Sequence, residues 1–305
     1  MKILVGAILL IFALLLVMAA IIFVQNCGRR QKPPTPHSSP ARPQMAQKIE
    51  DGKAWFLKQH YQIREITSFD TLKLKALYLP ADGDTTLILM HGYYGDPLYE
   101  FAPQLEFWHR QGYNLLLPYQ RAHGESEGKY LSFGIDESRD TAAWAEHINA
   151  ADAPKHIFLF GISMGGATVA MSALRQLPEN VRGIIADCPY GDPTAQFQYS
   201  LSHKVGLAAP IFLYLCSIWS RALAGWHFGN IFATDFTDAT LPLLILHGTN
   251  DPTVPDKMSA LLAEHWGGKV QRELFADCAH AYAYIKETKR YQRLVTDFMQ
   301  ANSPH

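Results

Sequence analysis

The segment that most constrains the fold is HIFLFGISMGGATVAM, residues 156–171. A short apolar run leads into the pentapeptide Gly161-Ile162-Ser163-Met164-Gly165, and small residues in a helical pattern follow it. This is the G-x-S-x-G pattern in the context of strand, sharp turn and helix. Such a turn strains the backbone of its central residue and leaves room only for glycine two positions away on either side. We therefore expect Ser163 to present its hydroxyl at the carboxyl end of a strand. The alternative is a serine that only caps the next helix.

The rest of the chain alternates apolar runs with helical patterns, which predicts βαβ units and a mainly parallel sheet. With 305 residues, 48% of them hydrophobic, the chain has ample material for a core. The predicted strands are 61–69, 72–80, 85–90, 113–117, 156–160, 181–187, 243–246 and 270–275. The predicted helices are 48–60, 97–110, 136–149, 164–176, 255–266 and 282–299.

The alternation is interrupted at about 190–235, a stretch with many large apolar and aromatic residues. A long insertion of this kind is typical of a helical lid over an active site. A second membrane helix at 205–219 is the competing interpretation. Lys204 and Arg221 flank that short apolar run closely, so a buried or interfacial helix is the better prediction.

An almost unbroken apolar run covers residues 3–24. About 20 apolar residues span a bilayer as a helix, so residues 1–26 are predicted to form a transmembrane anchor. A cleaved signal peptide has a shorter apolar region and an A-x-A-like site, whereas more apolar residues follow Ala19-Ala20 here. A lipoprotein signal ending at Cys27 is disfavoured, because Gln25-Asn26 matches poorly the small residues expected before it.

Residues 27–44 are predicted to be a linker between the anchor and a globular domain at 45–305. The stretch from 31 to 43 is rich in proline and poor in apolar residues, which is typical of an extended, semi-rigid spacer. A disordered tail with no spacing role is the alternative. Arg29, Arg30 and Lys32 follow the apolar run and only Lys2 precedes it, so the positive-inside rule taken literally places the domain in the cytoplasm.

Three further motifs follow predicted strands: His91-Gly92-Tyr93-Tyr94-Gly95, Thr249-Asn250-Asp251 and Cys278-Ala279-His280. With Ser163 they give the order serine, acid, histidine. From about residue 61 to its end, the chain resembles the α/β-hydrolase superfamily, in its branch of serine aminopeptidase-like and esterase-like acyl hydrolases. The resemblance implies the α/β-hydrolase fold and a catalytic triad of Ser163, Asp251 and His280. It also implies an oxyanion hole formed by the backbone N–H groups of Tyr93 and Met164.

Rivals exist for two of these roles. Asp256 and Asp277 are alternative acids, and an aspartate in a turn before proline is by itself an ordinary turn residue. His265 and His305 are alternative bases with weaker positions. The order of the motifs and their places at strand ends favour Asp251 and His280.

The loop at 118–128 departs from the pattern of similar proteins, where an aspartate usually stands at the position of Tyr119. The arginine, glycine and serine of that pattern remain, so the change is expected to loosen a salt bridge without affecting chemistry. Cys188 and Cys278 are expected near the catalytic face as inert buried thiols. A disulfide between them would need an oxidising compartment and close Cα atoms.

The sequence disfavours several other functions. A net charge of −1 without a long basic run argues against nucleic-acid binding. The four cysteines show no CxxC spacing, so no metal site is expected, and no cofactor is needed. We expect a serine hydrolase acting on a small ester substrate through an acyl-enzyme. A serine aminopeptidase or amidase with the same triad is the alternative, and an inactive membrane-tethered binding protein is a weaker one. Similar membrane-tethered hydrolases of bacteria often face outward, so either side of an inner membrane is open, as is the oligomeric state.

Overall fold

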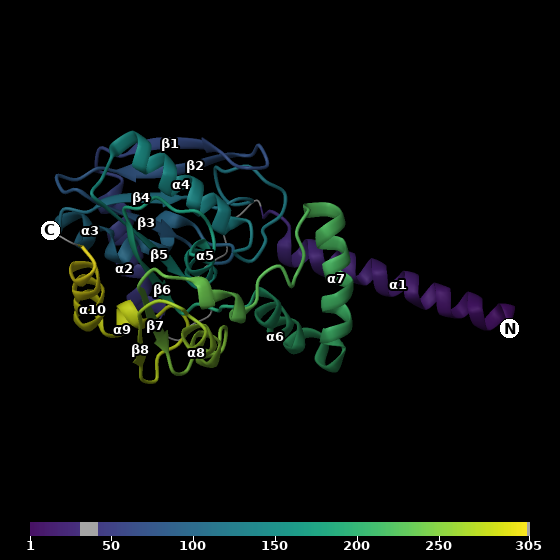
Figure 1. Cartoon of the computed structure of the whole chain (residues 1–305). Coiled ribbons are helices and arrows are strands. Elements are labelled where there is room, and N and C mark those ends of the chain that lie inside the picture. Colours follow the sequence, from purple (N-terminus) through teal and green to yellow (C-terminus); the bar gives the residue numbers. More distant parts are fainter. Residues whose placement is uncertain (31–41, 304–305) are drawn as a thin grey trace.

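The computed structural model describes residues 1–30 and 42–303, and an eight-stranded sheet forms the centre of that part of the chain (Figure 1). The strand order is β1-β2-β4-β3-β5-β6-β7-β8. Strand β2 pairs antiparallel with β1 and β4, and the other neighbours pair parallel. The strands are β1 (Gln62–Thr67), β2 (Lys73–Leu79), β3 (Thr85–Met90), β4 (Asn114–Pro118), β5 (His156–Ile162), β6 (Val181–Asp187), β7 (Leu243–Gly248) and β8 (Val270–Phe275).

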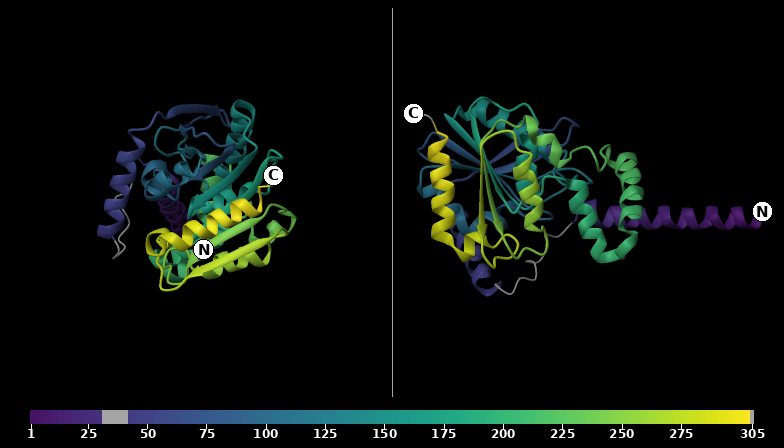
Figure 2. Two further views of the ribbon diagram at one scale, coloured as in Figure 1. Left: turned by 90° about the vertical axis from the view of Figure 1, so that its left-hand side faces the viewer. Right: turned by 60° about the horizontal axis from the view of Figure 1, so that its bottom comes forward.

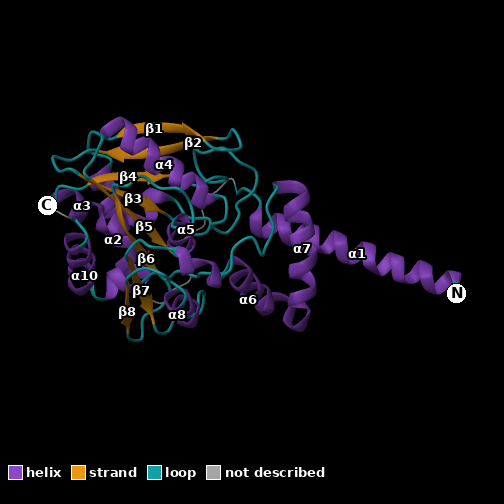
Figure 3. Ribbon diagram, viewed as in Figure 1, coloured by secondary structure: helices purple, strands orange, loops and turns teal. Residues whose placement is uncertain are grey.

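Helices lie on both sides of this sheet (Figure 3). They are α1 (Lys2–Cys27), α2 (Arg42–Phe56), α3 (Pro97–Arg110), α4 (Glu137–Asp152), α5 (Met164–Ser172), α6 (Pro193–Val205), α7 (Ala209–Ala224), α8 (Asp256–Glu264), α9 (Ala283–Lys286) and α10 (Thr288–Ala301). Two short 3-10 helices are η1 (Gly206–Ala208) and η2 (Ala233–Asp238).

The continuous apolar runs became strands that are buried on both faces, as parallel strands require. Every residue of β3, β4, β5 and β7 is buried. One core includes Trp144 of α4 and Leu262 of α8, and the other includes Trp108 of α3 and Phe298 of α10. The predicted fold, a mainly parallel sheet flanked by helices with a helical insertion, is confirmed.

Three predicted helices differ most from the structure in their limits. The helix expected over 48–60 begins earlier, at Arg42, and ends sooner because the chain must extend into β1. The helix expected over 164–176 ends at Ser172, after which the backbone N–H groups of residues 173–175 donate to carbonyl oxygens three residues back, as in a 3-10 turn. The expected last helix is divided into α9 and α10 by Glu287, whose φ of −131° is not helical.

The last turns of helix α1 are docked on the domain. Phe23 and Cys27 are fully buried, and Gly28 forms an isolated β-bridge with Tyr130. The backbone N–H of Arg29 donates to the carbonyl oxygen of Lys129 at 2.8 Å. The chain therefore leaves α1 along the surface of the domain and not as a free spacer.

The linker expected at 27–44 needs correction at both ends. Residues 27–30 belong to the packed domain surface, because their backbone pairs with the segment around Tyr130. Residues 42–44 already belong to α2. The remainder of the proline-rich stretch, 31–41, lies outside the described residues.

The insertion between β6 and β7 carries α6, η1, α7 and η2 and lies beside α1 (Figure 2). Its elements run from Pro193 to Asp238, close to the expected 190–235. Helices α6 and α7 together match a membrane span in length and composition, but Gly206, with φ +57°, ends α6 and prevents one straight helix. The stretch 205–219 is thus not a second straight spanning helix.

Candidate active site

The turn predicted around Ser163 joins β5 to α5. Ser163 has φ +58° and ψ −119°, a conformation that residues other than glycine rarely adopt. A Cβ at Gly161 would lie 2.0 Å from the carbonyl oxygen of Gly165, and a Cβ at Gly165 would lie 1.9 Å from that of Met90. The backbone passes so close to both positions that only glycine fits there, as the sequence predicted. The Ser163 side chain makes no capping bond to α5, so the alternative role of helix cap is excluded.

His280 lies between the other two residues of the predicted triad. Its Nε2 is 2.8 Å from Oγ of Ser163, and its Nδ1 is 2.6 Å from Oδ2 of Asp251. The three residues follow β5, β7 and β8, whose carboxyl ends share one edge of the sheet. An Nδ1–H that donates to a carboxylate leaves Nε2 free to accept the serine proton. This geometry can activate a serine as a nucleophile.

Asp251 is held as an ionised, fixed acceptor. Burial alone would raise its pKa, but hydrogen bonds from His247, His280 and the backbone hold that pKa below its ordinary value. Its Oδ1 accepts the backbone N–H groups of Thr253 and Val254 at 2.8 and 2.9 Å. The carboxylate is therefore charged at neutral pH and aimed at the imidazole.

The two predicted oxyanion donors belong to segments next to the serine. Met164 is the first residue of α5, so its N–H has no carbonyl partner within that helix. Tyr93 follows Gly92, where an added Cβ would lie 3.2 Å from Cβ of Ser163. The loop is held by Glu100, whose Oε2 accepts the N–H of Gly92 at 2.5 Å.

The rival residues lie elsewhere or have other partners. Asp256 pairs with Arg272 at 3.2 Å. Asp277 is exposed, and its backbone N–H donates to the hydroxyl of Thr249. His265 follows the last residue of α8, and His305 lies outside the described residues.

Two carboxyl groups near the serine were missed by the sequence analysis. Asp187 ends β6, and its carboxylate accepts the hydroxyl of Tyr291 at 2.8 Å. Burial raises the pKa of Asp187 to about 6 and that of Glu100 to about 7. The position of Asp187 could have been predicted, since it ends a strand next to β5 and therefore lies at the same edge of the sheet as the serine. That of Glu100 could not, because it lies within a helix.

Cys188, Asp251 and His280 place possible metal-ligand atoms within 4.8 Å of one another. Burial raises the pKa of the Cys188 thiol well above its ordinary value, whereas a metal ligand must be a thiolate. The other two residues already bond to each other, so this cluster fits proton transfer better than metal binding. Cys188 and Cys278 are both buried and free, so the disulfide considered from the sequence is not formed.

The loop after β4 has Tyr119 in place of an aspartate, yet its Arg121 is fully paired. The guanidinium donates to both oxygens of Asp140 at 2.6 and 2.7 Å and to both oxygens of Asp70 at 3.0 and 3.1 Å. The side chains of Arg121 and Asp140 are only 4% and 3% exposed. Carboxylates from other segments therefore replace the salt bridge that the sequence change was expected to loosen.

Aromatic rings of the insertion form a stack that reaches the loop of Tyr93. The ring centroids of Phe197 and Phe228 are 4.4 Å apart. Phe133 lies 5.3 Å from Phe197 and 5.4 Å from Tyr93. These rings hold the insertion onto the domain.

The end of α1 contacts the same loop. The hydroxyl of Tyr93 donates to the carbonyl oxygen of Asn26 at 2.7 Å, and that of Tyr94 donates to the carbonyl oxygen of Gly28 at 2.6 Å. The guanidinium of Arg30 lies 3.8 Å from the ring centroid of Tyr94. The end of α1, the insertion and the candidate oxyanion loop thus form one packed unit.

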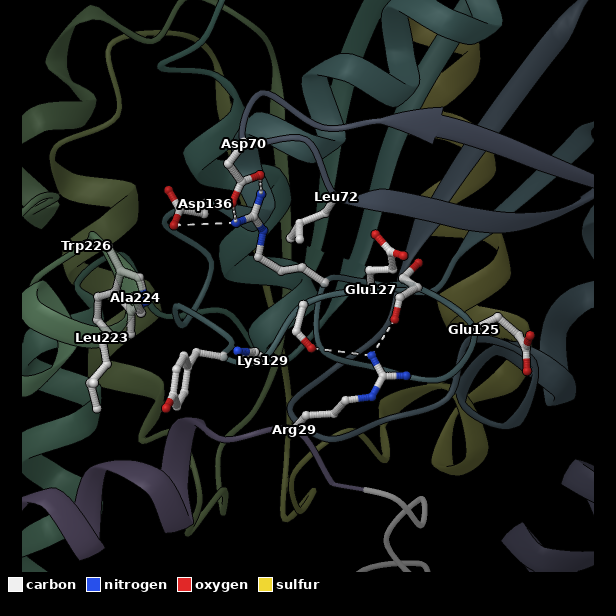
Figure 4. Close-up of a pocket in the computed structure, with 14 residues that line it drawn as sticks. Arg29, Asp70, Leu72, Glu125, Glu127, Lys129, Asp136, Leu223, Ala224 and Trp226 are labelled. Atoms are coloured by element: carbon white, nitrogen blue, oxygen red, sulfur yellow. Dashed lines mark hydrogen bonds and ion pairs between the residues drawn. The ribbon is translucent and has the colours of Figure 1, made fainter.

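A separate hollow of about 630 Å3 lies between the end of α7, the loop after β4 and the end of α1 (Figure 4). Leu223 and Trp226 form an apolar wall, and Arg29 lies apart from them. Arg121 also lines the hollow. Arg29 donates to main-chain carbonyl oxygens, and Arg121 is paired as described above. Ser163 does not line this hollow, so we assign it no part in the chemistry.

Known proteins are similar to this chain in sequence and in fold. Residues 81–230 match the family described as "Serine aminopeptidase, S33". The uncharacterized protein YqkD of Bacillus subtilis (strain 168) is 25% identical over 225 residues, which cover 72% of either chain. The pimeloyl-[acyl-carrier protein] methyl ester esterase of Yersinia enterocolitica is 26% identical over 273 residues, covering 75% of this chain and 100% of that one. The solved structure of the Pyrococcus furiosus esterase Pf2001 has a TM-score of 0.66 and 21% identity, covering 91% of this chain and 99% of that chain.

Proposed function

Because the chain belongs to the α/β-hydrolase superfamily and is a hydrolase, we propose that it cleaves carboxylic esters through an acyl-enzyme formed on Ser163. The observation that carries the proposal is the position of His280, whose ring nitrogens lie 2.8 Å from Oγ of Ser163 and 2.6 Å from Oδ2 of Asp251. That placement supports proton transfer between the serine and the imidazole.

In this mechanism Nε2 of His280 accepts the proton of Ser163 as Oγ attacks the ester carbonyl carbon. The imidazolium then gives that proton to the alcohol that leaves. In the second half, His280 takes a proton from water as the water oxygen attacks the acyl carbon. His280 then returns that proton to Oγ of Ser163 as the bond to the acid breaks. Asp251 orients the imidazole and stabilises its charged form, and the N–H groups of Tyr93 and Met164 donate to the developing oxyanion.

The substrate in this proposal is uncharged, with an apolar acyl group of short to medium length. The insertion lies at the sheet edge that carries the serine and contains few charges. Each methylene that such a surface removes from water contributes about 0.8 kcal/mol. Phe197 and Phe228 are already engaged in packing the insertion onto the domain, so other side chains must supply the acyl contact.

Amide cleavage, as by an aminopeptidase, is the second candidate. The match of residues 81–230 to a serine aminopeptidase family favours it, and the same triad attacks both kinds of bond. A catalytically inactive binding protein is a weaker candidate, because serine, histidine and aspartate are all present within hydrogen-bond distance.

A further part of the proposal is that α1 anchors the protein in a membrane as a single-pass helix. It has 26 residues and a mean hydropathy of 3.3 over its most apolar window. The docking of Phe23 and Cys27 on the domain supports retention of the helix over its removal as a signal. The positive charges after the helix favour a cytoplasmic domain, and an outward-facing domain is the alternative.

Labelling with a fluorophosphonate probe tests the serine assignment. Wild-type protein should be labelled, and Ser163→Ala should not. The substitution should also lower kcat/KM for p-nitrophenyl esters by at least about 1,000-fold, because only the oxyanion hole and binding remain. Ser202→Ala, at an exposed serine of α6, is the matched control and should behave like wild type. A labelled and active Ser163→Ala enzyme would refute the proposal.

The same assay distinguishes the acids and the substrate classes. Asp251→Asn should be strongly impaired. If Asp251→Asn were as active as the wild type and Asp277→Asn were inactive, Asp277 would be the acid of the triad. For substrates, rates should climb and then fall along a series of p-nitrophenyl esters from acetate upward. Faster cleavage of aminoacyl p-nitroanilides than of any ester would favour the aminopeptidase.

A further inference from the structure

The outer face of α7 is apolar and uncovered. Leu207, just before the helix, and Ile211, Tyr214 and Ile218 within it recur at intervals of four, three and four, so they share one helical face. Their exposed fractions run from 42% at Ile218 to 101% at Leu207. Arg221 is the only charged residue between Ala209 and Ala224. We call the side chains of Leu207, Ile211, Tyr214 and Ile218 the outer face of α7.

Helix α7 runs across α1 and not along it, as two views show (Figures 1 and 2). The indole N–H of Trp219 donates to the carbonyl oxygen of Leu16 at 2.9 Å, and Sγ of Cys216 lies 3.5 Å from that of Ala19. The two helices therefore meet at the level of residues 16–19 of α1. If α1 follows the bilayer normal, α7 lies close to the plane of the membrane.

The rise along α1 sets the depth of that crossing. A hydrocarbon core about 30 Å thick takes about 20 residues at about 1.5 Å each. Counted from Ile3, the first apolar residue, it ends near Ile22. Leu16 and Ala19 lie six and three residues before Ile22 (22 − 16 and 22 − 19), or about 9 and 5 Å inside the near boundary. Interfacial helices bury their apolar faces to a depth of about 5–10 Å.

Polar groups begin where the hydrocarbon ends. Nζ of Lys204 donates to Oδ1 of Asn26 at 2.8 Å. Arg29 and Arg30 follow α1. Along the helix axis, Asn26 and Cys27, the last residues of α1, lie about 6–8 Å beyond Ile22, which is the depth of lipid headgroups. In α1 and in the insertion, apolar side chains thus give way to polar ones at the same depth.

We infer that the outer face of α7 lies in the surface layer of the bilayer that α1 spans. The inference rests on the anchor proposed above and does not depend on chemistry at Ser163. A lipid surface is the occupant because α7 crosses α1 at Leu16 and Ala19, beside the exposed apolar residues Val17 and Met18, and a bilayer on α1 must reach this depth. If the hydrolase proposed above also acts at Ser163, the edge of the sheet that carries this serine would take acyl esters from the bilayer.

Lipid quenching of a label on α7 tests this arrangement in the full chain. Ile211→Cys and Ile218→Cys are each labelled with an environment-sensitive fluorophore and placed in nanodiscs of phosphatidylcholine and phosphatidylglycerol. Emission is compared between nanodiscs with and without lipids that carry a nitroxide on the acyl chain. The described cysteines are all buried and therefore poor competitors for the label. Leu10→Cys on α1 is the positive control. Ile63→Cys, at an apolar residue of β1 that is 68% exposed, is the matched negative control.

Quenching at positions 211 and 218 should exceed that at position 63 by at least about twofold, with blue-shifted emission. Quenching at position 10 without quenching at 211 and 218 would overturn the inference and leave the anchor intact. Blue-shifted emission at 211 without lipid quenching would also overturn it, in favour of a second copy on this face. Without quenching at position 10, the anchor and the inference fall together, while fluorophosphonate labelling still reports on the hydrolase.

Discussion

Replacing Arg121 with methionine should destabilise the protein through the carboxylate left behind. Methionine keeps an apolar stem of similar length and removes the guanidinium. Both oxygens of Asp140 bond to that guanidinium, and the Asp140 side chain is only 3% exposed. In Arg121→Met, a buried carboxylate would therefore have no counter-ion.

The magnitude follows from which partners are buried. Removing one member of a buried ion pair costs about 3–5 kcal/mol. Asp70, whose side chain is 39% exposed, can return to water and adds less than about 1 kcal/mol. For a domain of this size, 1 kcal/mol corresponds to about 2–4 °C, so Arg121→Met should lower Tm by about 6–20 °C.

The stability that Arg121→Met loses relative to the wild type should depend on pH. Burial raises the pKa of Asp140, and Arg121 opposes that rise. Without the arginine the pKa rises further, so the folded variant binds this proton more tightly than the unfolded chain does. Burial raises the pKa of Asp140 to about 7 even with Arg121 present, so wild type and variant lose stability alike up to about pH 7. The difference between them should grow as the pH rises above about 7, where only the wild type has released this proton.

Thermal unfolding of the detergent-solubilised full chain, from mildly acid to mildly alkaline pH, measures this. Asp70→Asn is the matched control and should shift Tm by no more than about 4 °C. Arg121→Met combined with Asp140→Leu should recover a large part of the loss, since the most buried carboxylate is then removed together with its partner. Asp136, which lies 3.6 Å from the guanidinium in the wild type, keeps Arg139 at 3.9 Å. A deficit below about 1 kcal/mol, or one that is constant with pH, would refute the reasoning.

Two further predictions concern Asp187 and the first residues of the chain. Burial raises the pKa of Asp187 to about 6, so the stability that this proton contributes is complete below about pH 4 and lost as the pH rises through 6. The free energy of unfolding of Asp187→Asn should therefore fall by about 3 kcal/mol less than that of wild type between about pH 4 and 7, and equal slopes in denaturant titrations would contradict this. Deleting residues 2–14, whose side chains are exposed, should leave Tm nearly unchanged, whereas deleting residues 1–43 should lower it by at least about 5 °C because the burial of Phe23 is lost. Equal Tm values for the two deletions would show that α1 is not docked.

Features with a local signal were predictable from the sequence. Strands β3 and β6 were predicted to the residue, because buried parallel strands are continuous apolar runs with clear boundaries. The serine turn was predictable because Gly161 and Gly165 are required by backbone contact alone. The order of the motifs and the place at a strand end distinguished Asp251 from Asp277, and the structure puts Asp251 beside His280.

Contacts between distant segments gave no such signal. The carbonyl oxygen of Asn26 accepts from Tyr93, and every residue offers a carbonyl, so nothing in the sequence marks this one. The linker was placed at residue 27 because composition changes there, while the packing of Cys27 and the bridge from Gly28 depend on the folded surface. The burial of Asp187 and Glu100 likewise depends on the neighbours that folding supplies.

The docking of α1 by Phe23, Cys27 and the Gly28 bridge leaves no hinge at the end of the helix. A domain on a flexible chain would sample many orientations above its anchor, whereas this one holds a single orientation relative to α1. With α1 in a bilayer, Ser163 would stay at one height above the lipid. A substrate in the same leaflet would then reach the serine by diffusion in the plane of the membrane. A substrate dissolved in water would have to reach it by diffusion in three dimensions.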